Sequence, residues 1–314
     1  MDEVADADQL REVLAPLLEH GRAKLSALKL PPAQLAELGF AVSGDEVSIP
    51  AGLERLNSET IRARMSARAE GWLTDFAVLE AVGSTNTMLS DLAGQRSIHG
   101  TARLAELQLQ GRGRRGRGWF SPYGNNLALS LGARLPFSVD QLGGFSLAVG
   151  LAVADALQRL GVGGIALKWP NDVLLDGRKI SGILIELHGG REATEVVIGI
   201  GINFRLPEAA RTLIDQPVTD LTEQGFALSR NETAAALLSS LVDFIDGFSV
   251  EGFEPMREAF DALHYYHGER CAILLGEERL EGMVLGVTTA GELRLAIDGE
   301  ERVFSSGEVS LRAL

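Results

Sequence analysis

Hydrophobic and polar positions alternate with different periods in three successive stretches of this chain. In residues 1–65, apolar side chains recur at helical spacing over Gln9–Leu18, and prolines open a second short helix at Pro32–Leu38. A glycine-containing turn then leads into a short apolar strand at Val47–Pro50. Helices followed by short strands predict a small winged-helix-like unit.

The stretch 66–265 carries both helical and strand periodicity. Helices are predicted at Ser84–Leu92, Gly143–Leu160 and Thr233–Phe248, the last with Asn231 as its cap. Strands are predicted at Arg103–Gln108, Asn126–Leu135, Ile165–Trp169, Val173–Leu175, Ile180–Leu187 and Val196–Phe204. Strands outnumber helices and several join through hairpins, so the stretch predicts an α+β domain built on a mixed or antiparallel sheet.

The last stretch, 266–314, contains short strands separated by turn residues and no helical period. The strands are predicted at Cys271–Leu275, Leu280–Leu285, Glu292–Ile297, Glu301–Phe304 and Val309–Leu311. Close, regular spacing of this kind predicts a small β-barrel.

Composition and charge narrow the classes of function. The 314 residues are 46% hydrophobic and carry a formal charge of -14, which argues against general affinity for nucleic acids or anionic membranes. Cys271 is the only cysteine, so an intrachain disulfide and a cysteine-rich zinc site are both excluded. The N-terminal residues lack a signal-peptide pattern and no apolar run approaches a membrane span, so we expect a cytoplasmic protein.

A loop of opposite charge stands out in this acidic chain. Gly111–Trp119 holds four arginines and four glycines before its closing tryptophan. Glycine allows backbone N–H groups to form an anion-binding nest, and arginine matches phosphate oxygens. A disordered nucleic-acid tract or a solvated charge run are the alternatives, but the segment occurs once, between two predicted strands. It predicts a phosphate clamp.

Three weaker signals accompany the loop. Lys168 ends an apolar strand, where it either extends to solvent or meets an anion near Asn171-Asp172. Ser84-Thr85-Asn86 either only caps a helix or offers its donors to a ligand. Gln108 can donate and accept, which suits a cyclic urea or an amide. The five histidines do not cluster at metal-ligand spacing, so no metal site is predicted from them.

Together these segments resemble the biotin protein ligase family in order and spacing. The resemblance runs from about residue 70 to the C-terminus and is carried by Gln108–Pro122, Lys168–Asp172, Gly182–Glu186 and Gly199–Asn203. It implies a class II synthetase-like catalytic domain and an SH3-like C-terminal barrel. It also implies that biotin and ATP, with Mg²⁺, form biotinyl-5′-AMP, and that biotin then passes to a lysine of a biotin carboxyl carrier protein.

The resemblance also implies residue roles. Catalysis falls to Lys168, Arg114 and Arg117. Biotin binding falls to Ser84, Thr85, Asn86, Gln108, Gly111, Arg112, Gly113, Arg114, Trp119, Lys168, Gly199 and Ile202. Nucleotide binding falls to Arg114, Arg115, Arg117, Trp119, Asn171, Asn203 and Arg312. The loop is expected to act as a lid over the adenylate.

Two departures bear on function. Some members repress genes through an N-terminal winged helix, but here Gly21–Leu30 leaves little room for its second helix. Residues 1–60 also hold 11 acidic against 5 basic residues, so we expect DNA binding and repression to be weak or lost. Pro217-Val218-Thr219 lies where some members place a tryptophan over adenine.

A lipoate-type transferase is the alternative enzyme class. An exposed sheet edge of the central domain is a candidate surface for a homodimer or for the carrier protein.

Overall fold

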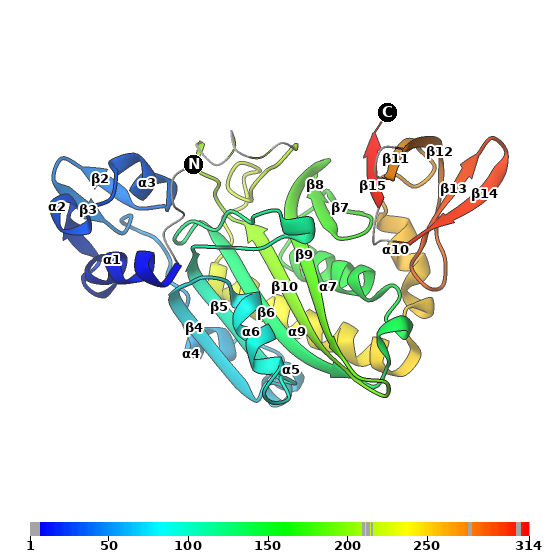
Figure 1. Cartoon of the computed structure of the whole chain (residues 1–314), viewed down its shortest axis with the longest axis horizontal. Coiled ribbons are helices and arrows are strands. Elements are labelled where there is room, and N and C mark those ends of the chain that lie inside the picture. The colour runs from blue at the N-terminus through cyan, green and yellow to red at the C-terminus, as the bar shows by residue number, and fades with distance from the viewer. Residues whose placement is uncertain are drawn as a thin grey trace.

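Three β-sheets follow one another along the chain in this computed structural model (Figure 1). The structure describes residues 7–208, 211, 214, 216–275, 278–305 and 309–313. The segment Leu213–Leu221 contains Pro217-Val218-Thr219 and departs from the family pattern, and its first residue, Leu213, lies outside the described residues. The central sheet has seven strands, flanked by a three-stranded sheet near the N-terminus and a five-stranded sheet near the C-terminus.

The central sheet is mixed, as predicted. Its order is β4-β5-β6-β10-β9-β8-β7, and every neighbouring pair is antiparallel except the parallel pair β4·β5. The strands are β4 (Asp75–Val82), β5 (Thr101–Gln108), β6 (Asn126–Leu135), β7 (Ile165–Lys168), β8 (Asp172–Leu175), β9 (Arg178–Gly189) and β10 (Thr194–Asn203). The nearly continuous apolar run of β10 occupies the centre, where both faces are covered.

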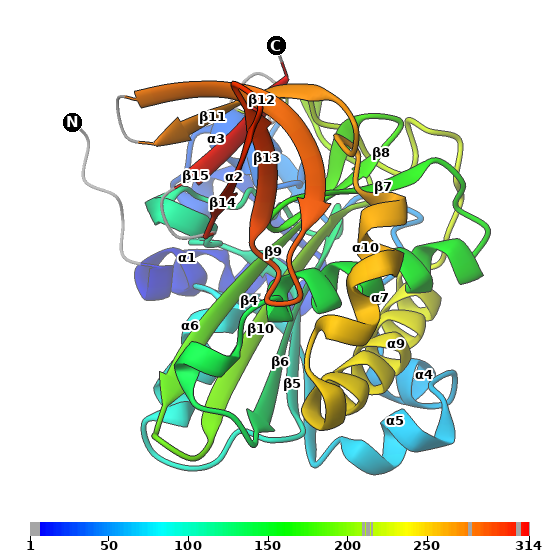
Figure 2. The same ribbon diagram turned by 90° about the vertical axis from the view of Figure 1, so that its right-hand side faces the viewer.

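Helices cover the two faces of this sheet unequally (Figure 2). The apolar helices α7 (Phe145–Arg159) and α9 (Arg230–Glu251) lie on one face, and α6 (Thr85–Ala93) lies on the other. By length and composition α9 could cross a membrane, but 61% of its apolar stretch is buried inside the protein. The predicted cap of α9 is wrong, because Ser229 rather than Asn231 accepts from a backbone N–H of its first turn.

Several short elements of the central region had no sequence prediction. They are α4 (Ser58–Arg62), α5 (Ala67–Trp72), α10 (Arg257–Leu263), η1 (Arg114–Gly116), η2 (Val139–Gln141) and η3 (Glu254–Met256). Each spans two turns or less, which is too short for a helical period to show.

The N-terminal unit has the complete order of a winged helix. Its elements are α1 (Ala7–His20), β1 (Arg22–Lys24), α2 (Leu25–Leu28), α3 (Pro32–Glu37), β2 (Ala41–Ser43) and β3 (Glu46–Ser48). The prediction that Gly21–Leu30 leaves little room for a second helix is therefore wrong, because a single turn, α2, suffices.

This unit is tied to the central sheet through polar and apolar contacts. Tyr123 donates its backbone N–H to the carbonyl of Leu38 at 2.8 Å and packs in the core of the N-terminal unit. Nearby, Nη1 of Arg230 and Oε2 of Glu106 form a buried ion pair at 2.6 Å. Arg230 also donates to the carbonyl of Glu54, so the pair holds the connecting segment against the sheet.

The C-terminal sheet is antiparallel throughout, with the order β14-β13-β12-β11-β15. Its strands are β11 (Arg270–Leu275), β12 (Glu278–Val287), β13 (Leu293–Ile297), β14 (Glu300–Phe304) and β15 (Val309–Ala313). Trp169, just after β7, donates its indole N–H to the carbonyl of Gly291 at 3.0 Å. This contact and β15 bring the C-terminal sheet beside the end of β7.

Candidate active site

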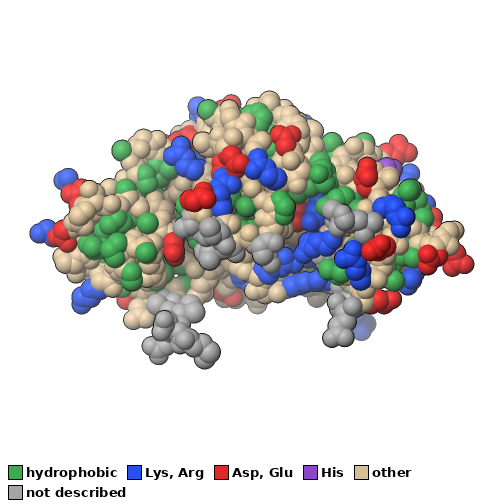
Figure 3. Space-filling view, turned by 90° about the horizontal axis from the view of Figure 1, so that it is seen from above, with side chains coloured by type: hydrophobic (Ala, Val, Ile, Leu, Met, Phe, Trp, Pro, Cys, Tyr) green, Lys and Arg blue, Asp and Glu red, His purple; other side chains and the backbone are tan. Residues whose placement is uncertain are grey.

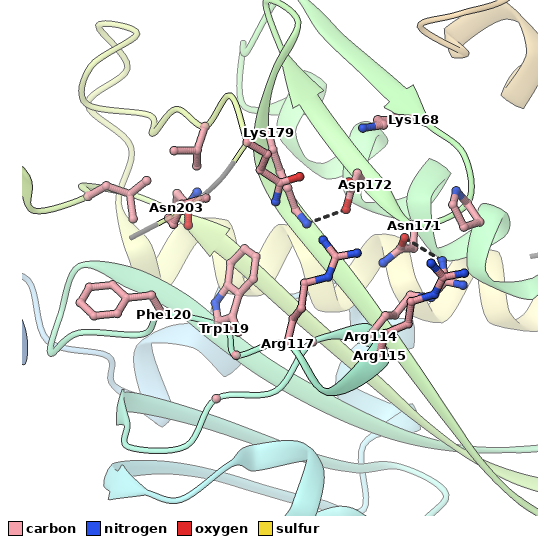
Figure 4. A pocket seen from close by; sticks show the side chains of 18 of the residues that line it. Arg114, Arg115, Arg117, Trp119, Phe120, Lys168, Asn171, Asp172, Lys179 and Asn203 are labelled. Atoms are coloured by element: carbon pink, nitrogen blue, oxygen red, sulfur yellow. Dashed lines mark hydrogen bonds and ion pairs between the residues drawn. The ribbon is translucent and has the colours of Figure 1, made fainter. Parts of the chain in front are cut away.

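Two adjoining cavities lie where the Arg/Gly loop, residues 111–119, crosses the central sheet. The larger one has a volume of about 500 Å³ and is enclosed by the loop, by the turn after β7 and by β15 (Figure 4). The smaller one, of about 60 Å³, lies between the start of α6 and strands β9 and β10. Residues that line both cavities are Gly113, Arg114, Trp119, Asn171 and Lys179.

The smaller cavity is lined by an ordered hydrogen-bond network. Thr85 donates both its backbone N–H and its hydroxyl to Oε1 of Gln108, at 2.9 and 3.0 Å. Ser130, on β6, lies 2.8 Å from the Thr85 hydroxyl, and its own hydroxyl donates to the side-chain oxygen Oδ1 of Asn86. The two bonds from Thr85 occupy the side-chain oxygen of Gln108, so the side-chain NH₂ of Gln108 is the group that can bind a ligand.

Glycines form the floor of this part of the site. Gly201 of β10 and Gly182 of β9 are direct cross-strand neighbours, and the Trp119 ring lies on both. A Cβ on Gly201 would lie 2.2 Å from that ring. A Cβ on Gly199 would lie 2.1 Å from Oδ1 of Asn86. The sheet therefore leaves room for ligand and ring only because these positions lack side chains.

Strand alternation corrects one predicted biotin residue. Ile202 follows Gly201 on β10 and points to the opposite face, where it belongs to the hydrophobic core under α7 and α9. It lines neither cavity, and Gly201 takes the predicted place in the lining. Gly111 lines the larger cavity, on the side where the loop meets Trp119.

The larger cavity is strongly cationic. Its lining includes six cations, namely Arg114, Arg115, Arg117, Lys168, Lys179 and Arg312. In Figure 3, Lys and Arg side chains gather on the face seen from above, between the centre and the C-terminal part. Among the described lining residues the only carboxylate is Asp172, which pairs with Lys179 at 2.6 Å. This charge distribution suits a polyanion.

Lys168 and the loop converge on this cavity from different elements. Lys168 ends β7 directly opposite Asp172 in the β7·β8 register. Burial lowers the pKa of Lys168, and Arg312, Lys179 and Arg117 lower it further, while Asp172 opposes the shift. Arg114 reaches across from the loop and donates to Oδ1 of Asn171 at 3.0 Å (Figure 4).

Trp119 separates the two cavities. Its ring lies on the glycine floor, and the ammonium of Lys179 lies beside it, 5.7 Å from the ring centroid and also close to Gly182. Its indole Nε1 is buried and has no hydrogen-bond partner in the part of the chain that the structure describes. The ring thus divides one trough into a polar compartment and a cationic compartment, and a ligand spanning both must displace or pack along it.

The structure brings together nearly all of the predicted site residues. Lining the smaller cavity are Ser84, Thr85, Asn86, Gln108, Arg112, Gly113, Arg114, Trp119 and Gly199. Lining the larger one are Gly111, Gly113, Arg114, Arg115, Arg117, Trp119, Lys168, Asn171, Asn203 and Arg312. Arg112 differs from the other loop arginines, because it turns toward β9 and pairs with Glu186 at 3.0 Å.

Sequence reasoning missed Lys179, Ser130, Gly182, Gly201 and Glu186. Lys179 had a usable signal, because it closely follows Asp176-Gly177, a strong turn signal that folds β9 back along β8 and toward Asp172. Gly182, Gly201 and Glu186 lie inside the segments that carry the family resemblance, but no role was assigned to them. Ser130 had no signal, since it is identified only by partners far away in the sequence.

Comparisons with known proteins agree with this site. Residues 78–203 match the Biotin/lipoate A/B protein ligase family, and residues 266–312 match the Biotin protein ligase C terminal domain. The "Bifunctional ligase/repressor BirA" of Escherichia coli (strain K12) is 36% identical over 275 residues, covering 87% of this chain and 84% of the relative. The chain belongs to the biotin protein ligase family.

Two further relatives extend this result to ligases of known structure and name. The "Biotin--[acetyl-CoA-carboxylase] ligase" of Mycobacterium tuberculosis is 34% identical over 263 residues, covering 81% of this chain and 95% of the relative. A biotin protein ligase from Aquifex aeolicus, solved with biotin and ATP, is 29% identical with a TM-score of 0.65, covering 77% of this chain and all of that one. The resemblance read from the motifs, the α+β fold class and the assignment to the biotin ligases are confirmed.

Proposed function

We propose that this ligase joins biotin to ATP as biotinyl-5′-AMP and then transfers biotin to a lysine of a biotin carboxyl carrier protein. The observation that carries the proposal is the pairing of a small polar compartment with a cationic one across Trp119. Biotin has the same order of chemical groups, since its cyclic urea is followed by an apolar ring and chain and then by a carboxylate. The ureido head lies by Gln108, and the carboxylate extends past Trp119 toward the cations.

The first step brings two anions together. A carboxylate oxygen of biotin attacks the α-phosphorus of ATP, and the bond to pyrophosphate breaks. Lys168, Arg114 and Arg117 are placed to offset the repulsion between the carboxylate and the phosphates, and to stabilise the charge that develops on the departing pyrophosphate. The chain supplies no covalent nucleophile in this step; the cationic cavity positions the reactants and stabilises their charge.

The cavity fits Mg²⁺ only as a companion of the nucleotide. No group of three or more His, Cys, Asp or Glu side chains that could hold a metal occurs among the described residues. Magnesium commonly binds through one or two carboxylates together with substrate phosphates, and Asp172 is placed for that role. Bound there, Mg²⁺ would neutralise phosphate charge.

The nucleotide base has an apolar wall available in the larger cavity. Leu206, Ile214, Val218 and Leu311 line it, together with Phe120. Val218 belongs to the segment where some family members place a tryptophan. We propose that these aliphatic side chains cover the adenine in this chain, while Asn203 lies at the same wall.

In the second step the carrier lysine attacks the acyl carbon and AMP leaves. The carrier must approach the cavities along an exposed part of the sheet. Strand β8 pairs with β9 only as far as Gly182, so no described strand pairs with the β8 side of β9 from residue 184 to 189. We propose this edge for carrier docking, and a second copy of the chain would compete for it.

We further propose that the N-terminal unit does not read operator DNA in this chain. The helix in the position of a recognition helix, α3, contains no lysine or arginine, and its exposed residues include Pro32, Ala33, Ala36 and Glu37. The β2–β3 turn exposes Asp45 and Glu46. Both surfaces would repel phosphates. A cytoplasmic location, where ATP is supplied, stays a prediction.

Pyrophosphate exchange tests the ligase reaction directly. The protein should exchange labelled pyrophosphate into ATP when biotin is present and not when lipoate replaces it. Lys168→Ala or Arg114→Ala should lower this exchange by about 10²-fold, because each removes a fixed cation from the reacting phosphate. Exchange with lipoate alone, or near-normal activity of both variants, would contradict the proposal.

A further inference from the structure

Glu186 on β9 bonds two separate groups of the smaller cavity with one carboxylate. Its Oε1 lies 3.0 Å from Nη1 of Arg112, and its Oε2 accepts from Nδ2 of Asn86 at 2.9 Å. Its neighbour Ile185 packs on the core of the opposite face, so alternation directs Glu186 toward α6 and the loop. The carboxylate therefore joins the Arg/Gly loop, β9 and the start of α6.

This carboxylate also sets the direction of the network inside the cavity. An ionised carboxylate only accepts hydrogen bonds, so Asn86 must turn its NH₂ toward Glu186. The carbonyl of Asn86 then faces Ser130 and the floor at Gly199. Ser130 in turn lies 2.8 Å from the Thr85 hydroxyl, and the backbone N–H of Thr85 donates to Oε1 of Gln108. A chain of bonds thus runs from Glu186 to the residue that meets the ligand head.

We propose that Glu186 is a positioning residue for the biotin head. It fixes the orientation of Asn86 and holds Arg112 beside the entrance of the smaller cavity. Glu186 is absent from the described lining of both cavities, so it acts through these two neighbours rather than on the ligand. This inference rests on the proposed function, because it assigns the smaller cavity to biotin.

Because of its position, Glu186 should affect the binding of biotin and not the reaction at the phosphate. The carboxylate of Glu186 contacts Asn86 and Arg112, which line the smaller cavity, whereas Lys168 and Asp172 line the larger one. Its loss should therefore weaken the hold on biotin while the reacting phosphate keeps its surroundings. A residue with a merely structural role would instead lower stability or affect both substrates alike.

The test is the substitution Glu186→Gln, which keeps the shape but sets an NH₂ against one of two donors. We expect the KM for biotin in pyrophosphate exchange to rise about tenfold, with kcat and the KM for ATP changed by less than about twofold. Glu186→Asp, which keeps the charge, should fall between wild type and Glu186→Gln. Glu301→Gln is the matched control, because it breaks an ion pair with Arg294 in the C-terminal sheet, 2.8 Å long, away from both cavities.

The outcomes distinguish this inference from the ligase assignment. An unchanged KM for biotin in both Glu186 variants, or a loss of kcat with KM unchanged, would overturn the positioning role. If Glu186→Gln fails to fold by thermal melting, the KM for biotin of Glu186→Asp decides in its place. Absence of biotin-dependent exchange in the wild-type protein would overturn the proposed function instead.

Discussion

Lys168 shows how the surroundings of one residue constrain the reaction. Its charge is opposed by burial and by neighbouring cations, so its pKa lies below the usual lysine value. An amine that must be charged to meet a phosphate then loses its proton at lower pH than an ordinary lysine. The alkaline limit of activity should lie correspondingly low.

The first prediction concerns that alkaline limit. Asp172 raises the pKa of Lys168, so Asp172→Asn should move the alkaline limb of the exchange–pH profile to lower pH. Lys168→Arg is the control, since arginine keeps its charge and should remove the lysine contribution to that limb. A limb that stays in place in Asp172→Asn would contradict the assignment of the titration to Lys168.

A second prediction concerns His264, which is 5% exposed and has no hydrogen-bond partner on either ring nitrogen among the described residues. Burial, with a smaller contribution from His267, lowers its pKa to about 4 from 6.5. The unfolded chain therefore binds the extra proton as pH falls below 6.5. The native state should lose about 2 kcal/mol of stability between pH 8 and pH 5 from this residue.

Denaturant unfolding across that pH range measures the loss. His264→Phe keeps an aromatic ring beside Phe260, on which His264 stacks at 5.4 Å, and removes the titrating group. The variant should show a flatter dependence of unfolding free energy on pH between 5 and 8. Parallel curves for the two proteins would show that His264 does not cause the acid loss.

At the scale of elements, long periodic segments were predictable and short ones were not. The strand Asn126–Leu135 and the long apolar helices α7 and α9 follow from periodicity, because each repeats its pattern several times. The single-turn α2 and the helices α4, α5 and α10 do not, because their formation depends on packing against neighbours. The strand β4 also had no prediction, although it pairs in parallel with β5.

The third prediction tests the glycine floor formed by β9 and β10. Gly201→Ala places a Cβ where the Trp119 ring now lies, 2.2 Å away, and should raise the KM for biotin by at least about tenfold. Gly163→Ala is the control, because a Cβ there meets nothing within 4 Å. Unchanged biotin affinity in Gly201→Ala would show that Trp119 and the ligand do not depend on this floor.

At the scale of the whole molecule, charge distinguishes the N-terminal unit from the site. A protein with a formal charge of -14 concentrates six cations in one cavity, while the exposed α3 surface and the β2–β3 turn carry none. The N-terminal unit therefore combines the element order of a winged helix with two surfaces that carry no lysine or arginine, which is the basis for proposing that it does not bind DNA.

The fourth prediction follows from that distribution. In a mobility-shift experiment with biotin operator DNA and biotinyl-5′-AMP, this protein should give no sequence-specific retardation at about 10⁻⁸ M. Scrambled DNA of equal length is the control for general affinity. Retardation of the operator but not of the scrambled DNA at that concentration would contradict the prediction and support a repressor function.

The sequence by itself determined the long elements, the family and most of the chemical groups of the site, because periodicity and local motifs are written in consecutive residues. Only the tertiary structure decided which face of a strand meets the ligand, so that Gly201 lines the site and Ile202 the core. It also decided the pairing of Lys179 with Asp172 and of Glu186 with Arg112. Such contacts join residues brought together by sheet register and packing, which a single sequence does not encode locally.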